Sequence, residues 1–177
     1  MSLNSVALTS QRLLLMPFTS NDAPEAFEAA TPTLTRFMGW DPAPSLEVFA
    51  QIWRSWFPMM TAGTDLHLVV REKLTLEFLG MAGLHNISAD EPETGIWIKE
   101  SRHGYGYGRE AVAAVISFAA RDLGKWAVLY PVVEQNGSSR HLAERLGGGI
   151  VGTRVLRKAG GVVHPEVVYR ISALTKS

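Results

Sequence analysis

The stretch Ser101-Arg102-His103-Gly104-Tyr105-Gly106-Tyr107-Gly108-Arg109-Glu110 places three glycines at alternate positions between two different hydropathy patterns. Residues 94–98, just before it, are rich in β-branched and aromatic types and predict a strand. In residues 110–123, which follow, apolar side chains recur at helical spacing. A strand that turns through glycines into a helix directs backbone N–H groups and the positive end of the helix dipole toward one point. This geometry suits a phosphate or pyrophosphate group.

Two better-known glycine loops do not fit this spacing. A dinucleotide-binding G-x-G-x-x-G loop that began at Gly104 would need glycine at position 109, where the chain has Arg109. A nucleotide-binding G-x-x-x-x-G-K-[ST] loop needs lysine and then a hydroxyl residue after its last glycine, and neither follows Gly108. A flexible turn, in which the glycines only permit positive φ, stays open as an alternative at this point.

The composition of the whole chain excludes several classes of protein. Its 177 residues favour one domain, residues 1–177. Lys plus Arg and Asp plus Glu both number 17, so the formal net charge is zero and a global basic field for nucleic acid is absent. No apolar run suits a membrane span and no secretory signal precedes the first strand, so we expect a cytoplasmic protein without membrane or direct nucleic-acid partners. Cysteine is absent, which excludes disulfides, thiolate metal sites and a cysteine nucleophile.

The remaining patterns predict an α+β fold, with one mixed, mostly antiparallel sheet of about seven strands and flanking helices. Pro131 interrupts the fifth predicted strand and cannot donate a ladder hydrogen bond. We therefore expect the fourth and fifth strands to splay apart and leave a cleft with free backbone groups. The predicted strands span residues 11–18, 66–71, 78–84, 94–98, 126–133, 150–157 and 162–171, and the predicted helices lie near residues 24–30, 45–60, 110–123 and 138–146.

A second motif follows the glycine loop after one predicted helix and one predicted strand. It consists of Asn136-Gly137-Ser138-Ser139 and then Glu144-Arg145-Leu146-Gly147. Together with the loop at residues 103–108, it resembles the two cofactor motifs of the GNAT acyltransferase superfamily. More narrowly, the chain is similar to the ribosomal-protein-alanine/serine N-acetyltransferase branch, the RimJ/RimL type. The further segments that carry this resemblance are residues 12–15, 18–23, 35–40, 78–87 and 94–98.

Two positions depart from the family pattern. His103 stands where the family usually has Gln or Arg, so it could contact a phosphate only when protonated or through its remaining N–H. Gly148 replaces the aromatic residue that usually follows Leu-Gly, which removes a packing contact beside the cofactor tail. These departures concern affinity for the cofactor and leave the predicted fold unchanged.

The resemblance implies an enzyme that transfers an acetyl group from acetyl-CoA to a primary amine by direct attack in a ternary complex. The amine would belong to a protein N-terminus or to a small molecule, no metal is implied, and a homodimer is compatible with the family. The alternative is a non-catalytic acyl-CoA-binding or sensing module of the same fold. In either case the resemblance assigns cofactor binding to the backbone of Ile98 and Lys99, to the loop residues His103, Gly104, Tyr105, Gly106, Tyr107, Gly108 and Arg109, and to Asn136 and Ser139.

Three residues are candidates for the chemistry. Ser139 occupies the position of a hydroxyl proposed to protonate the departing thiolate, although it could equally be a helix residue without chemistry. Glu93 is the first candidate for the base, because it leads into the fourth strand at the expected cleft and matches an acidic position common in the family. His85, at the end of the third strand, is the second candidate. A solvated turn carboxylate and a hydrogen-bonded strand end are the respective alternatives.

Other polar and aromatic residues keep two interpretations. Asn136 could bind the pantetheine arm or only cap the following helix. A group of aromatic residues could line an acceptor groove or pack in the core, as aromatics at helical spacing usually do. These residues are Trp40, Trp53, Trp56 and Phe57.

Overall fold

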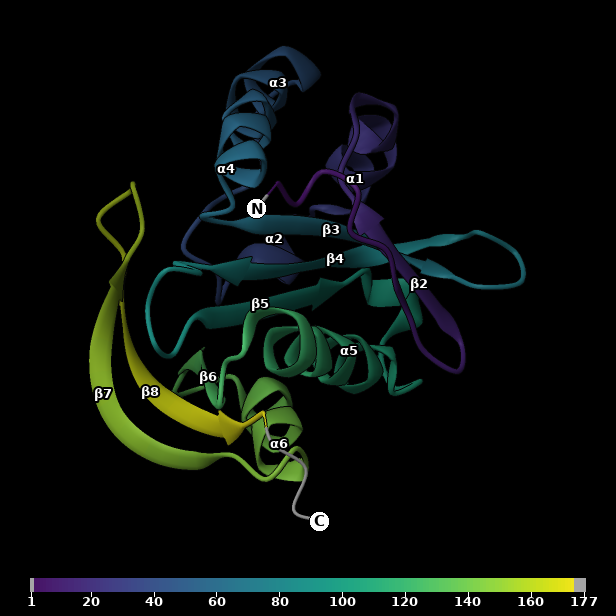
Figure 1. Ribbon diagram of the computed structural model, residues 1–177. Helices are drawn as coiled ribbons and strands as arrows, with labels where there is room; N and C mark the ends of the chain where they lie inside the picture. Colours follow the sequence, from purple (N-terminus) through teal and green to yellow (C-terminus); the bar gives the residue numbers. More distant parts are fainter. Residues whose placement is uncertain (1, 174–177) are drawn as a thin grey trace.

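The computed structural model describes residues 2–173 and confirms the α+β class, with one mixed and mostly antiparallel sheet. The strand order is β1-β2-β3-β4-β5-β6-β8-β7, and β5 and β6 run parallel (Figure 1). The strands are β1 (Leu8–Thr9), β2 (Leu13–Pro17), β3 (Leu66–Glu72), β4 (Phe78–His85), β5 (Glu93–Ile98), β6 (Ala127–Val133), β7 (Gly149–Arg157) and β8 (Val163–Ser172). The helices are α1 (Ala23–Ala29), α2 (Pro32–Thr35), α3 (Leu46–Arg54), α4 (Trp56–Ala62), α5 (Tyr107–Leu123) and α6 (Gly137–Arg145), with short 3-10 turns at Ser20–Asp22 and Glu100–Arg102.

The structure differs from the predicted elements in three places. The two-residue strand β1 pairs with β2 and gives the sheet eight strands where the pattern predicts about seven. The predicted helix at residues 45–60 divides at Ser55, whose hydroxyl donates to the Ile52 carbonyl at 2.6 Å, and Pro58 lacks an N–H in the first turn of α4. Helix α2 forms in a segment predicted to be irregular, because the Thr31 hydroxyl accepts from the Leu34 N–H at 3.1 Å.

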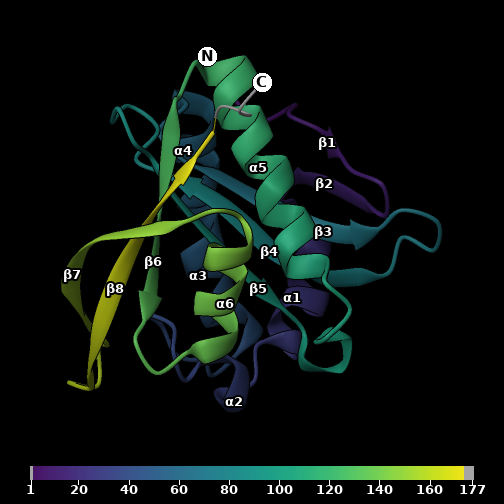
Figure 2. The same ribbon diagram turned by 90° about the horizontal axis from the view of Figure 1, so that it is seen from below.

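Helices cover both faces of the sheet, with α5 and α6 on one face and α1 and α3 on the other (Figure 2). The alternation of side chains along β3 shows how the sequence produces this layering. Leu66 and Leu68 are fully buried in the large cluster under α5, whereas Val69 belongs to the smaller cluster beneath α1 and α3. His67 shares the second face with Val69, and this face carries the polar groups described below.

Strands β5 and β6 separate as predicted. Their register is limited to Glu93 opposite Leu129, whose N–H donates to the Pro92 carbonyl at 2.9 Å. Beyond that point Pro131 has no N–H to donate, and β6 pairs along its other edge with β8. The carboxyl ends of the two parallel strands therefore diverge at the place where the glycine loop begins.

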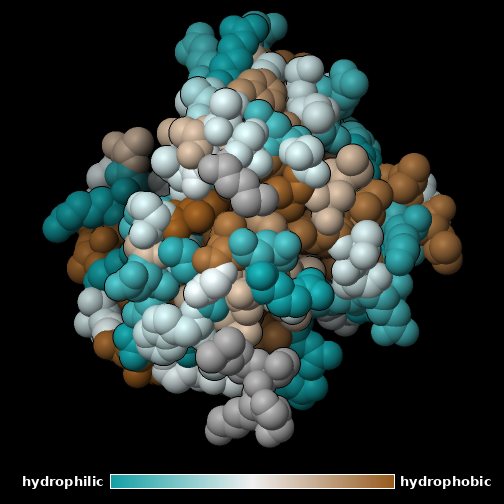
Figure 3. Space-filling view, viewed as in Figure 1, coloured by the Kyte–Doolittle hydropathy of each residue, from teal (hydrophilic) through white to brown (hydrophobic). Residues whose placement is uncertain are grey.

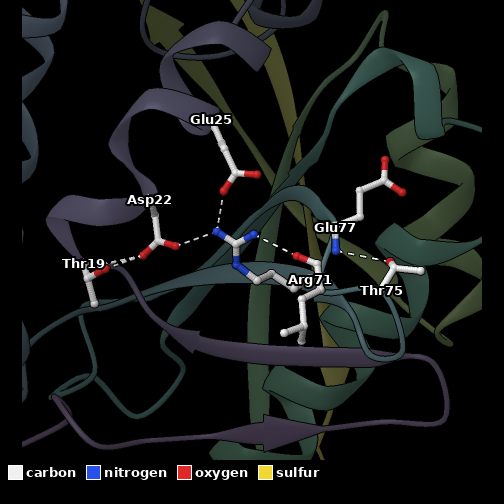
Figure 4. A network of polar contacts seen from close by, with 7 residues as sticks. Thr19, Asp22, Glu25, Arg71, Thr75 and Glu77 are labelled. Carbon is white, nitrogen blue, oxygen red and sulfur yellow. Dashed lines mark hydrogen bonds and ion pairs between the residues drawn. The ribbon is translucent and has the colours of Figure 1, made fainter.

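A polar network centred on Arg71 fixes α1 to the sheet (Figure 4). Its guanidinium forms ion pairs with Asp22, at 2.8 Å, and with Glu25, and it donates to the Leu76 carbonyl at 2.9 Å. The Asp22 carboxylate also accepts from the backbone N–H and the hydroxyl of Thr19. Because α1 forms part of a cavity wall, this network holds that wall in place.

The surface mixes polar and apolar residues. Figure 3 shows polar surface interrupted by apolar patches, one of which lies at the projecting turn between β3 and β4. This turn carries Leu74 and Leu76, which are 90% and 55% exposed. Within residues 2–173, no helix has both the length and the apolar composition that crossing a membrane requires.

Candidate active site

The glycine loop presents a run of free backbone donors. Gly104 and Gly106 have φ values of 84° and 80°, in the left-handed region that favours glycine, and Gly106 is the N-cap of α5. Among residues 2–173, no acceptor bonds the backbone N–H groups of residues 104–109, and the next N–H, of Glu110, donates to the Gly106 carbonyl at 3.2 Å. Free N–H groups at a helix N-terminus form an anion site, so this geometry favours pyrophosphate binding over a merely flexible turn.

Glu110 anchors this loop to the N-terminal strands. Its carboxylate accepts from the Ser10 hydroxyl and from the Arg12 backbone N–H, both at 2.7 Å, and it forms an ion pair with the Arg12 guanidinium at 2.7 Å. Burial alone would raise the pKa of Glu110, but the hydrogen bonds from Ser10 and Arg12 outweigh it and leave this pKa below its usual value. Arg12 also donates to the Tyr105 carbonyl at 3.0 Å, so its guanidinium lies against the loop. The sequence motif alone did not identify Arg12 as part of the site.

The backbone groups assigned to pantetheine binding have partners within the protein. His103 Nε2 donates to the Ile98 carbonyl at 2.6 Å, and the Lys99 N–H donates to the Leu79 carbonyl at 2.7 Å. The Lys99 ammonium also forms an ion pair with Glu77 at 2.8 Å. Contacts of Ile98, Lys99 and His103 with the cofactor stay a prediction, and the engaged groups would have to exchange partners to make them.

A cavity of about 530 Å³ lies where β5 and β6 separate. Its walls come from these strands, from β3, β4, β7 and β8, from the start of α6, from helices α1, α3 and α4, and from the loop before α3. Three of the predicted residues, His85, Asn136 and Ser139, line this one cavity although they come from distant parts of the chain. The loop at residues 103–109 and Glu93 are not part of its lining.

Two hydroxyl groups form a pair in this cavity. Ser139 Oγ lies 2.9 Å from the hydroxyl of Tyr130, and either atom can be the donor. Burial raises the pKa of Tyr130 to about 12, although its hydrogen bond with Ser139 acts in the opposite direction, so the phenol stays protonated at neutral pH. Asn136 Oδ1 accepts from the Ser139 N–H at 3.2 Å, so the residue caps α6, and its side chain also faces the cavity.

His85 is oriented by a carboxylate. Its Nδ1 lies 3.2 Å from Asp65 Oδ1. A carboxylate can only accept, so Nδ1 carries a proton in this contact, and in the neutral imidazole Nε2 is then the ring atom with the lone pair. A Cβ on Gly83, two residues earlier on the same face of β4, would overlap His85 Nε2, so the glycine makes room for the imidazole. An imidazole held in this tautomer can accept a proton.

His67 completes the polar part of the cavity. Its ring stacks on Trp56, with the centroids 4.5 Å apart, and its centroid lies 5.2 Å from that of His85. Burial, and secondarily the neighbouring His85, lower the pKa of His67 to about 4, although Asp65 acts in the opposite direction. Its Nε2 is buried and has no hydrogen-bond partner in the part of the chain that the structure describes. Sequence reasoning missed His67, although its alternation with Leu66 and Leu68 could have indicated a polar residue on the other face.

The structure places Glu93 in an ion-pair network. Its two carboxylate oxygens lie 2.7 and 3.1 Å from the Nη1 and Nη2 atoms of Arg154, whose Nε donates to Glu166 at 2.7 Å. The guanidinium therefore occupies both oxygens of this carboxylate, the atoms that a base would use. The role of Glu93 as a base stays a prediction, and the geometry of the cavity favours His85.

Comparisons with known proteins identify the family of the chain. The family model described as acetyltransferase (GNAT) domain matches residues 12–148. A search of curated proteins gives no significant match. Because the family model spans most of the chain, it decides the family, and the structural similarities described next bear on the fold.

Several solved structures share the fold at low sequence identity. A Vibrio cholerae protein provisionally described as a ribosomal-protein-serine acetyltransferase is 22% identical, with a TM-score of 0.82 over 97% of this chain and 99% of that one. Mycobacterium smegmatis RimJ, solved with CoA-disulfide, is 18% identical, with a TM-score of 0.79 over 91% and 82%. Spermidine N-acetyltransferase of Vibrio cholerae, solved with CoA and spermine, is 15% identical, with a TM-score of 0.79 over 93% and 97%. The chain belongs to the GNAT family of acetyl-CoA-dependent N-acetyltransferases.

Proposed function

We propose that this cytoplasmic acetyltransferase acetylates a primary amine by direct attack in a ternary complex, with His85 as the base and Ser139 as the donor to the leaving thiolate. The observation that carries the proposal is the cavity between β5 and β6. It holds a carboxylate-oriented imidazole and a protonated hydroxyl pair within one space. General acid–base catalysis by such groups typically contributes about 10²- to 10⁴-fold to a rate.

The proposed cofactor position follows from the free donors. The N–H groups of residues 104–109 would bind the pyrophosphate of acetyl-CoA, and the Arg12 guanidinium, which Glu110 neutralises, would hold the loop through its bond to the Tyr105 carbonyl. The pantetheine arm would then extend from the start of α5 into the gap between β5 and β6, where Asn136 lines the cavity. This path would place the thioester among the polar groups of the cavity.

The proposed reaction uses both polar pairs. The neutral amine attacks the thioester carbonyl, so that a C–N bond forms and the C–S bond breaks. His85 Nε2 takes the proton that the amine loses, and Asp65 stabilises the resulting imidazolium. The Ser139 hydroxyl donates its proton to the thiolate sulfur as the Tyr130 hydroxyl passes its own proton to the Ser139 oxygen. The Tyr130 oxygen then takes a proton from solvent and His85 releases the amine proton to solvent, so both pairs return to their starting state.

Steady-state kinetics with a panel of amines tests this proposal. We expect release of one CoA thiol for each acetylated amine, and intersecting double-reciprocal lines when both substrates are varied. Parallel lines, or a covalent acetyl-enzyme detected by mass spectrometry, would contradict direct attack. CoA binding without turnover of any amine would instead indicate a non-catalytic binding module.

A further inference from the structure

The cavity that holds the catalytic candidates also has aromatic walls. The loop before α3 contributes Trp40, whose ring meets that of Trp97 edge-on with the centroids 6.3 Å apart. Trp53 and Phe57 are not part of this lining and pack beside the core cluster that contains Phe18. The aromatic side chains that line the cavity, apart from Tyr130, are Phe27, Phe37, Trp40, Phe49, Trp56 and Trp97.

Part of this apolar lining is open to solvent. Trp40 is 42% exposed and Ile52 is 45% exposed, although both line the cavity. Large apolar side chains that are exposed beside a cavity mark a surface that a ligand can cover. An apolar ligand group that covers Trp40 and Ile52 would therefore gain free energy from their burial.

The charged groups of the cavity already have partners. Apart from histidines, the charged residues in its lining are Asp41, Arg154 and Glu166. Lys158 forms an ion pair with Asp41 at 2.6 Å, and Arg154 forms an ion pair with Glu166 at 2.7 Å. A second ammonium group, as in a polyamine or a basic peptide, would find no unpaired carboxylate among these lining residues. It would have to compete with Lys158 and Arg154 for these carboxylates, which weakens its binding.

The polar floor of the cavity suits one amino group. His67 and His85 lie side by side, and Nε2 of His67 has no hydrogen-bond partner among residues 2–173. Gly83 and Gly95 oppose each other on β4 and β5 and both line the cavity, so neither strand fills the floor with a side chain there. A small polar head can reach the imidazoles while an apolar body remains among the aromatic walls.

We propose that the acceptor is a primary amine carried on an aromatic or bulky apolar group. Its amino group would lie at His85 and His67, and its apolar body would pack against Trp40 and its aromatic neighbours. This inference rests on the proposed function and specifies the acceptor class for the same site. The amine could be a free arylalkylamine or the N-terminus of a peptide that begins with an aromatic residue, and the experiment separates these two sources.

The first arm of the experiment compares acceptors at saturating acetyl-CoA. 2-Phenylethylamine and a peptide beginning with Phe represent the proposed class, and spermidine and a peptide beginning with Ser represent the alternatives. We expect kcat/KM for at least one aromatic acceptor to be tenfold or more above the values of kcat/KM for spermidine and for the Ser peptide. The better of the two aromatic acceptors identifies the source. Any smaller advantage, or a preference for spermidine or the Ser peptide, would overturn the inference.

The second arm uses a matched pair of tryptophan variants. Trp40→Ala removes an exposed wall of the cavity, and Trp126→Ala removes a tryptophan that is 49% exposed and lies outside the lining. We expect Trp40→Ala to raise KM for the preferred aromatic acceptor at least fivefold, and Trp126→Ala to leave it within twofold. Equal values of KM in the two folded variants would overturn the inference.

Calorimetry of 2-phenylethylamine and of the Phe peptide with the CoA-loaded protein separates the two proposals. Binding that Trp40→Ala weakens, without turnover of any amine, would support the acceptor site and contradict the proposed function. Turnover of spermidine together with no binding of either aromatic ligand would support the proposed function and overturn the acceptor class.

Discussion

The hydroxyl groups of Ser139 and Tyr130 lie 2.9 Å apart inside the cavity between β5 and β6. Ser139 belongs to the first turn of α6, and Tyr130 belongs to β6 immediately before Pro131. The contact therefore connects the motif at residues 136–139 to β6, the strand that diverges from β5 and so forms the opening in the sheet. Because burial keeps the Tyr130 phenol protonated, the pair can supply a hydrogen bond wherever negative charge develops beside it.

Replacement of Ser139 tests its role as a donor. We expect Ser139→Ala to lower kcat about 10- to 100-fold and to change KM for acetyl-CoA by less than about threefold, because the donor acts on the leaving thiolate. Ser138→Ala, at an exposed neighbouring position outside the cavity lining, is the matched control and should keep wild-type kcat. An increase in KM with unchanged kcat would show that Ser139 only binds the cofactor.

The contact with Tyr130 can be measured separately. Tyr130→Phe keeps the ring and removes the hydroxyl, so we expect a smaller loss of kcat than in Ser139→Ala. If the two groups act as one chain, the double variant should lose little more than Ser139→Ala alone, with a coupling energy of about 0.5 to 3 kcal/mol. Strictly additive losses of activation free energy would mean that the hydroxyls act independently.

Substitution of the N-cap glycine tests the anion site. Gly106→Val places a branched side chain beside the free N–H groups, and Gly124→Val makes the same change at the C-cap of the same helix. Both glycines have positive φ, 80° and 65°, so the backbone strain is of the same kind. We expect Gly106→Val to weaken CoA binding at least tenfold, about 1.4 kcal/mol, and Gly124→Val to leave the dissociation constant unchanged. Equal affinities in calorimetry of the two folded proteins would refute the pyrophosphate assignment.

Two conservative variants decide between the candidate bases. We expect His85→Gln to lower kcat about 100-fold, because glutamine keeps polarity but cannot take the amine proton. Glu93→Gln should keep kcat within about threefold, since Arg154 already holds that carboxylate outside the cavity lining. The opposite ranking, measured at saturating concentrations of both substrates, would restore Glu93 as the base.

The features that could be predicted from the sequence are local ones. The alternate glycines at the start of α5 and the missing N–H of Pro131 act through their own backbone, so the loop and the strand opening follow from residue type. Strand β1 is different, because two residues cannot form a strand without their partner. It exists through pairing with β2 and lies beside the Ser10 contact with Glu110, 100 positions away.

The arrangement of the site depended on register, which the sequence patterns do not specify. His67 reaches His85 because β3 and β4 pair with His67 opposite Gly83. Glu93 meets Arg154 across 61 positions, through the hairpin of β7 and β8, and this contact engages a carboxylate that the sequence patterns leave without a partner. Such non-local contacts decide which of several equally plausible polar residues can act as a base.

His67 makes the free energy of unfolding depend on pH within a defined range. Its folded-state pKa of about 4 lies below the ordinary value of 6.5, so the unfolded chain binds the proton more tightly. The stabilisation from the neutral, buried imidazole is fully present above about pH 6.5 and is lost as the pH falls toward 4. The free energy of unfolding falls by at most about 3 kcal/mol over this range. The charged or titratable groups that act on His67 are His85 and Asp65. Contacts with Arg102 and Lys99 lower the pKa of Glu77 to about 2. Glu77 therefore affects stability at lower pH, between about pH 4.5 and 2.

Urea unfolding of wild type and His67→Gln at pH 7 and pH 4.5 measures this term. Glutamine does not titrate, so we expect the wild type to lose about 2 kcal/mol more than the variant between the two pH values. His141→Gln, at an exposed position of α6, controls for the removal of one histidine. If wild type and His67→Gln lost the same free energy of unfolding, His67 would have to be protonated in the folded protein at pH 4.5. The acceptor site would then carry a positive charge that opposes binding of an ammonium group at acidic pH.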